Sequence, residues 1–136
     1  MLSQFPEEEV NQCFCAIQQA IIHCFKSCQK VIINDKHSFE LYGFDFLIDS
    51  NLKSWLLEIN ASPSLSGTGG SDGELKGQLL DDTLTIVDME KVLSGNEVQV
   101  GGFDLIYKGG PIIMASNSTL QTLLGCHNNR INQSKQ

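Results

Sequence analysis

The sequence predicts an α+β fold in which one antiparallel hairpin packs with two helices. Apolar residues recur at three- and four-residue steps over residues 6–31 and again over 74–93, as on the buried face of a helix. Between these segments, residues 39–48 and 55–59 are rich in aromatic and aliphatic side chains. The polar turn 49–51 separates them, which is the pattern of two paired strands.

The first helix is expected from about Pro6 to Val31. Proline suits the first helical position, and the glutamates at positions 7–9 complement the positive end of the helix dipole. We expect the apolar face of this helix to lie across the hairpin. That face is formed by Val10, Phe14, Ile17, Ile21, Cys24, Phe25 and Cys28.

The second helix is expected from Glu74 to Leu93, with Asp72 as its cap. The glycine-rich segment 66–73 before it lacks the Gly-Lys-Ser/Thr ending of a phosphate-binding loop, so a flexible connector is predicted. These elements place one domain at residues 1–93.

An irregular extension, partly disordered, is expected over residues 94–136. Within it, residues 101–107 could form a short strand and residues 109–111 a turn. The polar end from His127 to Gln136 is predicted to be disordered.

The hairpin carries three oxygen-bearing side chains among apolar ones. If its loop centres on Asn51 and Leu52, Asp45 lies directly across from Glu58, and the alternation of a strand places Asn60 on the same face as Glu58. Two carboxylates opposite each other repel, so their presence favours a cation between them. Mg²⁺ is the best fit, because it prefers oxygen ligands and completes its shell with water and substrate phosphates. The alternative is that both acids are simply solvated on an open sheet face.

The run from Phe39 to Leu65 resembles the metal-binding hairpin of the tubulin tyrosine ligase-like family of ATP-grasp ligases. The shared residues are Gly-Phe-Asp at 43–45, Trp-Leu-Leu-Glu-Ile-Asn at 55–60 and Ser-Pro-Ser-Leu at 62–65. The resemblance covers about residues 6–88, and the 60–65 ending is more similar to the glutamate-adding members than to the tyrosine-adding founder. It implies the C-terminal part of an ATP-grasp domain, so the chain is expected to be the last part of a longer enzyme.

The resemblance also implies a site and a reaction. Asp45, Glu58 and Asn60 would hold the Mg²⁺ that bridges the phosphates of ATP, and Lys76 would contact the incoming free glutamate. A glutamate carboxylate of tubulin would be phosphorylated and then attacked by the amino group of free glutamate, with no side-chain nucleophile in the protein. For Lys76 the alternative is an ordinary exposed helix lysine.

Tubulin or microtubules, and possible subunits of a polyglutamylase complex, are the implied partners. The implied location is the cytoplasm and cytoskeleton, including the axoneme or basal body of a cilium or flagellum. Two other functions stay open. One is a truncated, noncatalytic module that binds tubulin or polyglutamylase subunits, and the other is an ATP-grasp ligase for a small metabolite.

Charge and composition indicate which classes of partner, location and metal site the chain can have. A net charge of −7 argues against nucleic acid and against unaided binding to acidic tubulin tails. No apolar run reaches the ~18 residues of a membrane span. Five cysteines and no signal peptide predict reduced thiols inside the cell. No zinc site is expected, because the closely spaced cysteine pairs do not converge on one helix face; the five are Cys13, Cys15, Cys24, Cys28 and Cys126.

Overall fold

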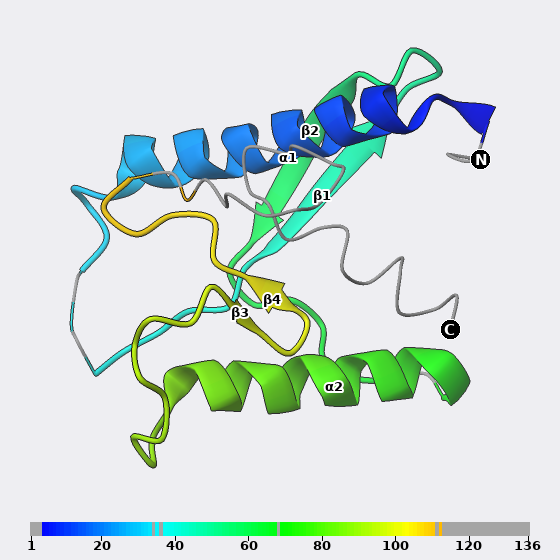
Figure 1. The fold of residues 1–136 in the computed structure, drawn as a ribbon. Helices are drawn as coiled ribbons and strands as arrows, with labels where there is room; N and C mark the ends of the chain where they lie inside the picture. Colours follow the sequence, from blue (N-terminus) through cyan, green and yellow to red (C-terminus); the bar gives the residue numbers. More distant parts are fainter. Residues whose placement is uncertain (1–3, 34, 36, 68, 111, 113–136) are drawn as a thin grey trace.

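The computed structural model describes residues 4–33, 35, 37–67, 69–110 and 112, and these form two helices and two antiparallel hairpins (Figure 1). The α+β class is therefore confirmed. Helix α1 lies across the first hairpin, and α2 lies on the other side of the second, smaller hairpin (Figure 1). The elements are α1 (Glu7–Cys28), β1 (Gly43–Ile48), β2 (Ser54–Asn60), α2 (Gly70–Val87), β3 (Gln99–Val100) and β4 (Phe103–Asp104).

Helix α1 packs on the first hairpin through aromatic side chains. The ring of Phe25 meets the rings of Phe44 and Tyr42 edge-on, at centroid distances of 5.6 and 5.3 Å. This confirms the predicted packing. The helix is shorter than predicted at both ends. Pro6 has an extended ψ of 140°, so it precedes the helix and is not its first residue, and the helix ends at Cys28 instead of Val31.

The loop of the first hairpin is centred on Asn51 instead of between Asn51 and Leu52, so the pairing next to the loop is shifted by one residue from the prediction. The backbone N–H of Asp49 donates to the carbonyl of Lys53 at 3.0 Å, so Asp49 faces Lys53. A loop centred between Asn51 and Leu52 would pair Ser50 with Lys53, and this part of the prediction is wrong. The carboxylate of Asp49 accepts hydrogen bonds from the indole of Trp55 (3.1 Å) and from the backbone N–H groups of Asn51 (2.9 Å) and Lys53 (3.0 Å). These donors, led by Trp55, lower the pKa of Asp49.

A β-bulge restores the predicted register beyond the loop. Near the loop Phe46 pairs with Leu56, whereas further along Asp45 pairs with Glu58, so Leu57 is the extra residue on β2. The pairing of Asp45 with Glu58 is thus confirmed. It arises because the one-residue shift of the pairing at the loop is cancelled by the extra residue at the bulge.

Helix α2 begins and ends earlier than predicted. It begins at Gly70 because Gly69 adopts a φ of 105°, a value that favours glycine and turns the chain into the helix. Asp72 therefore lies inside the first turn, and the prediction that it caps the helix is wrong. The helix ends where Asp88 adopts a left-handed conformation, and the Asp88 carboxylate accepts the backbone N–H groups of Val92 (2.7 Å) and Leu93 (3.1 Å).

The second hairpin is fixed to α2 by a buried carboxylate. Asp82, only 6% exposed, accepts a hydrogen bond from the backbone N–H of Gly102 at 2.6 Å and one from Gln78 at 2.8 Å. Gly101 has a φ of 52° and lies so close to Asp82 that any side chain would collide with the carboxylate. In place of the single short strand predicted at residues 101–107, the structure has two short strands, β3 and β4. The main contact of α2 is with β3 and not with the first hairpin.

Few apolar side chains are fully buried. Among the described residues these are Cys13, Ile22 and Leu52, and many large apolar side chains are exposed on the first hairpin, on α2 and on the segments that follow α1 and α2. None of the described helices is long and apolar enough to cross a membrane. The domain boundary at Leu93 stays a prediction, and residues 127–136 lie outside the described part of the chain. Prominent exposed apolar residues are Val31, Ile33, Phe39, Leu57, Leu75, Leu84, Met89 and Val92.

Candidate functional site

The candidate site lies on the face of the first hairpin that α1 leaves open. Phe44 faces α1, and the alternation of side chains along a strand therefore directs Asp45 to the opposite face. Its partner Glu58 shares that face, and so does Asn60, which pairs with Gly43. The structure thus brings together the three residues that the sequence predicted as metal ligands.

Hydrogen bonding orients part of this set. The amide nitrogen of Asn60 donates to Oε1 of Glu58 at 3.1 Å, which leaves the amide oxygen of Asn60 and the second oxygen of Glu58 available. Among the described residues, no side chain forms a hydrogen bond or ion pair with the carboxylate of Asp45. Both acids are exposed and Asn60 is half-buried, so a small ligand has access to all three.

The surroundings of the acid pair are apolar toward the hairpin tip. Leu47 pairs with Trp55 on the same face, and their side chains are 55% and 46% exposed. The bulge at Leu57 lies between this apolar pair and the acids, and bulges often redirect side chains next to active sites. The face therefore offers a cluster of oxygen ligands beside a flat apolar surface.

The donor set fits a hard divalent cation. Two carboxylates and one amide oxygen are the ligand types that Mg²⁺ prefers, and two or three protein ligands leave room for water and phosphate oxygens. Among the described residues no group of three or more His, Cys, Asp or Glu side chains could hold a metal, so any protein site here depends on Asn60 as its third ligand. Cross-strand partners lie about 4.5–5.5 Å apart at their Cβ atoms, a spacing that two carboxylates can bridge through one ion.

Lys76, the predicted glutamate contact, lies elsewhere in the fold. It is in the second turn of α2, because the helix begins at Gly70, and its ammonium group donates to the carbonyl of Ser66 at 2.8 Å and to Asp72 at 3.1 Å. None of the hydrogen bonds or ion pairs of the described residues joins it to the hairpin acids. Its side chain is 24% exposed, so the ammonium group is partly accessible.

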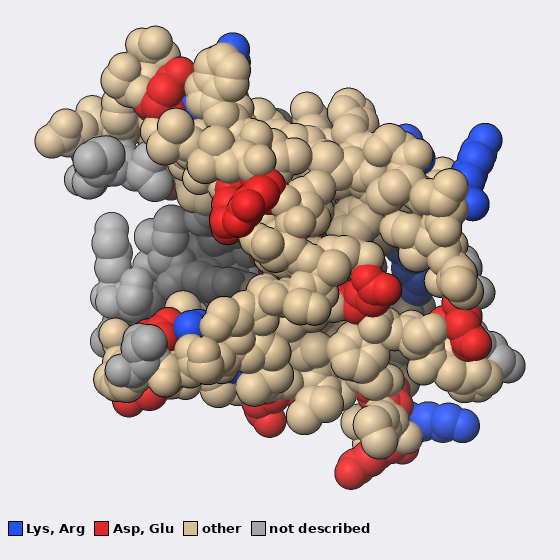
Figure 2. Space-filling view, turned by 180° about the vertical axis from the view of Figure 1, so that it is seen from behind, with Lys and Arg blue, Asp and Glu red and all other residues tan. Residues whose placement is uncertain are grey.

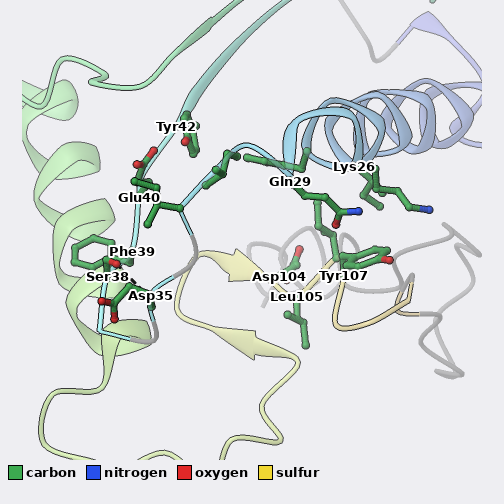
Figure 3. Close-up of a pocket in the computed structure, with 15 residues that line it drawn as sticks. Lys26, Gln29, Asp35, Ser38, Phe39, Glu40, Tyr42, Asp104, Leu105 and Tyr107 are labelled. Atoms are coloured by element: carbon green, nitrogen blue, oxygen red, sulfur yellow. Dashed lines mark hydrogen bonds between the residues drawn. The ribbon is translucent and has the colours of Figure 1, made fainter.

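A cavity that the sequence did not predict lies beside the C-terminal end of α1. It has a volume of about 570 Å³ and is formed by the end of α1, the segment leading to β1, and residues 104–107 after the second hairpin. Figure 3 shows Lys26 from α1 and Gln29 just after it, with Tyr107 near them and Glu40 and Tyr42 across the cavity. Its lining comes from three separate segments, so no local motif could reveal it. None of the four predicted site residues lines it.

Charged side chains are sparse on the face seen in Figure 2. The face seen from behind in Figure 2 carries separate groups of acidic side chains on a largely uncharged surface. No broad basic patch is seen on this face (Figure 2), in keeping with the net charge of −7.

Comparison with known proteins identifies the fold family. The tubulin-tyrosine ligase family matches residues 4–97, which include both helices and the whole candidate site. The chain is 48% identical, over 145 aligned residues, to a probable tubulin polyglutamylase TTLL9 from Bos taurus; the alignment covers all of this chain and 32% of that protein. No solved structure matches the chain.

Other relatives show how far the similarity extends. The probable tubulin polyglutamylase ttll-9 of Caenorhabditis elegans is 53% identical over 92 residues, covering 68% of this chain and 22% of that protein. A tubulin glycylase 3B of Tetrahymena thermophila is 42% identical over 96 residues, covering 68% of this chain and 8% of that protein. The 60–65 motif predicts a glutamate-adding member resembling the ninth or first of the family, and the similarity to the TTLL9 proteins confirms this resemblance.

The chain spans about a third of the length of the first of these relatives. Its matched region nevertheless includes every element that positions Asp45, Glu58, Asn60 and Lys76. The chain belongs to the tubulin-tyrosine ligase family.

Proposed function

We propose that this chain supplies the magnesium-binding hairpin of an ATP-dependent ligase that adds glutamate to tubulin. The observation that carries the proposal is the cross-strand pairing of Asp45 with Glu58 beside Asn60, on the open hairpin face of a member of this family. The similarity to probable tubulin polyglutamylases supports glutamate as the added residue.

The roles of the residues follow from their chemistry. Asp45, Glu58 and the amide oxygen of Asn60 would hold Mg²⁺, and their exposure leaves the remaining positions open to ATP phosphates. When bound, the ion would neutralise charge that develops on the transferred phosphoryl group. Lys76 would bind a carboxylate of the incoming glutamate through its ammonium group.

The proposed reaction has two stages. The γ-phosphoryl group of ATP passes to a side-chain carboxylate of tubulin, which releases ADP and forms an acyl phosphate. The amino group of free glutamate then attacks the acyl carbon, phosphate leaves, and an amide bond forms. Both stages occur without a covalent bond to this chain. The protein therefore has to hold and orient the substrates and neutralise the charge on the phosphoryl group, and the candidate residues are suited to those tasks.

The net negative charge of the chain affects how it could bind tubulin. A charge of −7 would repel the acidic tails of tubulin, so we propose that basic surfaces outside this chain, or subunits of a polyglutamylase complex, bring tubulin to the site. The corresponding location is the microtubule cytoskeleton, including the axoneme and basal body.

A chimera tests the proposal. This chain would replace the segment that it matches in the cattle relative, and incorporation of labelled glutamate into tubulin would be measured with ATP and Mg²⁺. Asp45→Asn and Glu58→Gln should each abolish incorporation, because each removes a charged ligand. Asp81→Asn removes an exposed acid of α2 and serves as the matched control, which should keep full activity. Unchanged incorporation in both hairpin variants would refute the proposal.

A noncatalytic role is the second candidate. It is favoured by the exposed apolar side chains of Leu75 and Leu84 on α2 and of Met89 just after it, which could bind a partner protein. In that case a polyglutamylase subunit or tubulin would be retained equally by the chain and by its Asp45→Asn variant, and the chimera would incorporate no glutamate.

A further inference from the structure

We propose that Asp72 is a positioning residue that holds Lys76 in the orientation needed to receive a carboxylate of the incoming amino acid. The inference rests on the proposed role of Lys76 and adds the means by which its flexible side chain is fixed. Asp72 lies one turn before Lys76 on α2, and the two form an ion pair of 3.1 Å.

The hydrogen bonds of Lys76 show how its direction is set. An ammonium group has three N–H donors. One donates to Asp72 and a second to the carbonyl of Ser66 at 2.8 Å. Two fixed acceptors determine the direction of the third donor, which has no acceptor among the described residues, and the partial exposure of the side chain gives a ligand access.

The Ser66 carbonyl is itself held in place by close packing of the chain. Gly67 lies against the backbone of Gly73, and a Cβ added at Gly67 would come within 2.8 Å of the Cα of Gly73. The hydroxyl groups of Ser64 and Ser66 are also within hydrogen-bond distance of each other, at 3.0 Å. The segment that leads into α2 is therefore folded back on the first turn of the helix, which presents the Ser66 carbonyl to Lys76.

Asp72 suits this task better than a neutral side chain would. A lysine stem has four rotatable bonds, and an aspartate four residues before it supplies a charged acceptor within reach on the same helix face. Both side chains are partly buried, at 24% and 38% exposure, which reduces screening of the pair by solvent. An ion pair that only stabilised the helix would not affect amino-acid binding, and this difference makes the proposal testable.

The kinetic test uses the chimera with free glutamate as the varied substrate. Asp72→Asn should raise the KM for glutamate by about threefold to fivefold, the range expected for losing a partly exposed ion pair, and leave kcat within about twofold. Asp72→Glu should restore the KM, and Asp81→Asn should not change it. Lys76→Gln should raise the KM at least as much as Asp72→Asn.

The outcomes separate this inference from the proposed function. If Lys76→Gln raises the KM and Asp72→Asn does not, Asp72 has no positioning role, although the role of Lys76 stands. If neither variant changes the KM, the proposed contact of Lys76 with glutamate is itself wrong. A loss of kcat alone in Asp72→Asn, without a change in KM, would also overturn the positioning role.

A second measurement needs no catalysis and uses the chain as it is. The two ε-methylene protons of a lysine have different NMR shifts when its side chain is fixed and a single shift when it rotates freely. Lys76 should show two shifts in the unaltered chain and in Asp72→Glu, and one shift in Asp72→Asn. A single shift in the unaltered chain would contradict the proposed positioning.

Discussion

Replacing Asp45 by asparagine should stabilise the metal-free chain and at the same time remove its response to Mg²⁺. Asp45 and Glu58 are direct cross-strand partners, and Asp45 has no compensating ion pair among the described residues. Like charges in this arrangement destabilise a hairpin by roughly 0.2–1 kcal/mol. Asparagine keeps the size and one oxygen of the side chain but removes the repulsion, so the free energy of unfolding should rise by about 0.5 kcal/mol.

The response to Mg²⁺ should change in the opposite direction. A ligand present at ten times its Kd stabilises the folded state by about 1.4 kcal/mol. The unaltered chain should gain this stabilisation in Mg²⁺, and Asp45→Asn should lose most of it. At a few degrees of melting temperature per kcal/mol, the variant should melt about 2 °C higher than the unaltered chain without metal and lower than it with metal.

Thermal unfolding followed by circular dichroism, with Mg²⁺ and with EDTA, measures both effects. Asp81→Asn is the control for a general reduction of negative charge and should respond to Mg²⁺ as the unaltered chain does. The reasoning would be refuted if Asp45→Asn destabilised the metal-free chain, or if both chains gained equally from Mg²⁺.

The remaining predictions concern the second hairpin and α2. Gly101→Ala should destabilise the chain by about 2 kcal/mol or more in chemical unfolding, because the methyl group would collide with Asp82 and the residue has a φ of 52°. Gly77→Ala, in the middle of α2 with open space around it, should instead stabilise the chain by about 0.5–1 kcal/mol in the same assay, and a loss of stability there would show that α2 is not a helix at that position. Two hydrogen bonds from Ser94, through its hydroxyl and its backbone N–H, lower the pKa of Glu97 to about 2. Because this pKa is depressed in the folded state, the contribution of Glu97 to stability is present above about pH 4.5 and is lost as the pH falls toward 2. Carboxyl ¹³C NMR should give a midpoint near 2, and a midpoint near 4.5 would show that the Ser94 contacts are absent.

The sequence could predict that Asp45, Glu58 and Asn60 share one hairpin face, because this arrangement depends on short-range regularities. Alternation along two strands is enough to place Glu58 and Asn60 on one face, and the composition of the strands is enough to identify the hairpin. The register was not predictable in this way, since the loop centre depends on the hydrogen bonds of Asp49, and the bulge at Leu57 interrupts the regular pairing without a signal in the alternation of the strand. Two shifts of one residue in opposite directions left Asp45 opposite Glu58.

Features that depend on backbone conformation or on distant segments could not be predicted in the same way. The left-handed conformations of Gly69 and Asp88 set the ends of α2, and neither is required by the hydrophobic pattern of the helix. The burial of Asp82 depends on a turn about 20 residues later in the chain. The cavity beside Lys26 needs three segments that meet only in the folded chain.

The most direct test of the central claim is calorimetric titration of the chain with a nonhydrolysable ATP analogue, with and without Mg²⁺. The same titration would be run on Asp45→Asn and on the control Asp81→Asn. If the hairpin holds the metal that binds nucleotide, the unaltered chain and the control should bind the analogue only in Mg²⁺, and Asp45→Asn should not bind it. Equal binding by Asp45→Asn and the unaltered chain, or the absence of Mg²⁺-dependent binding by the folded chain, would contradict the claim that this hairpin is a magnesium–nucleotide site.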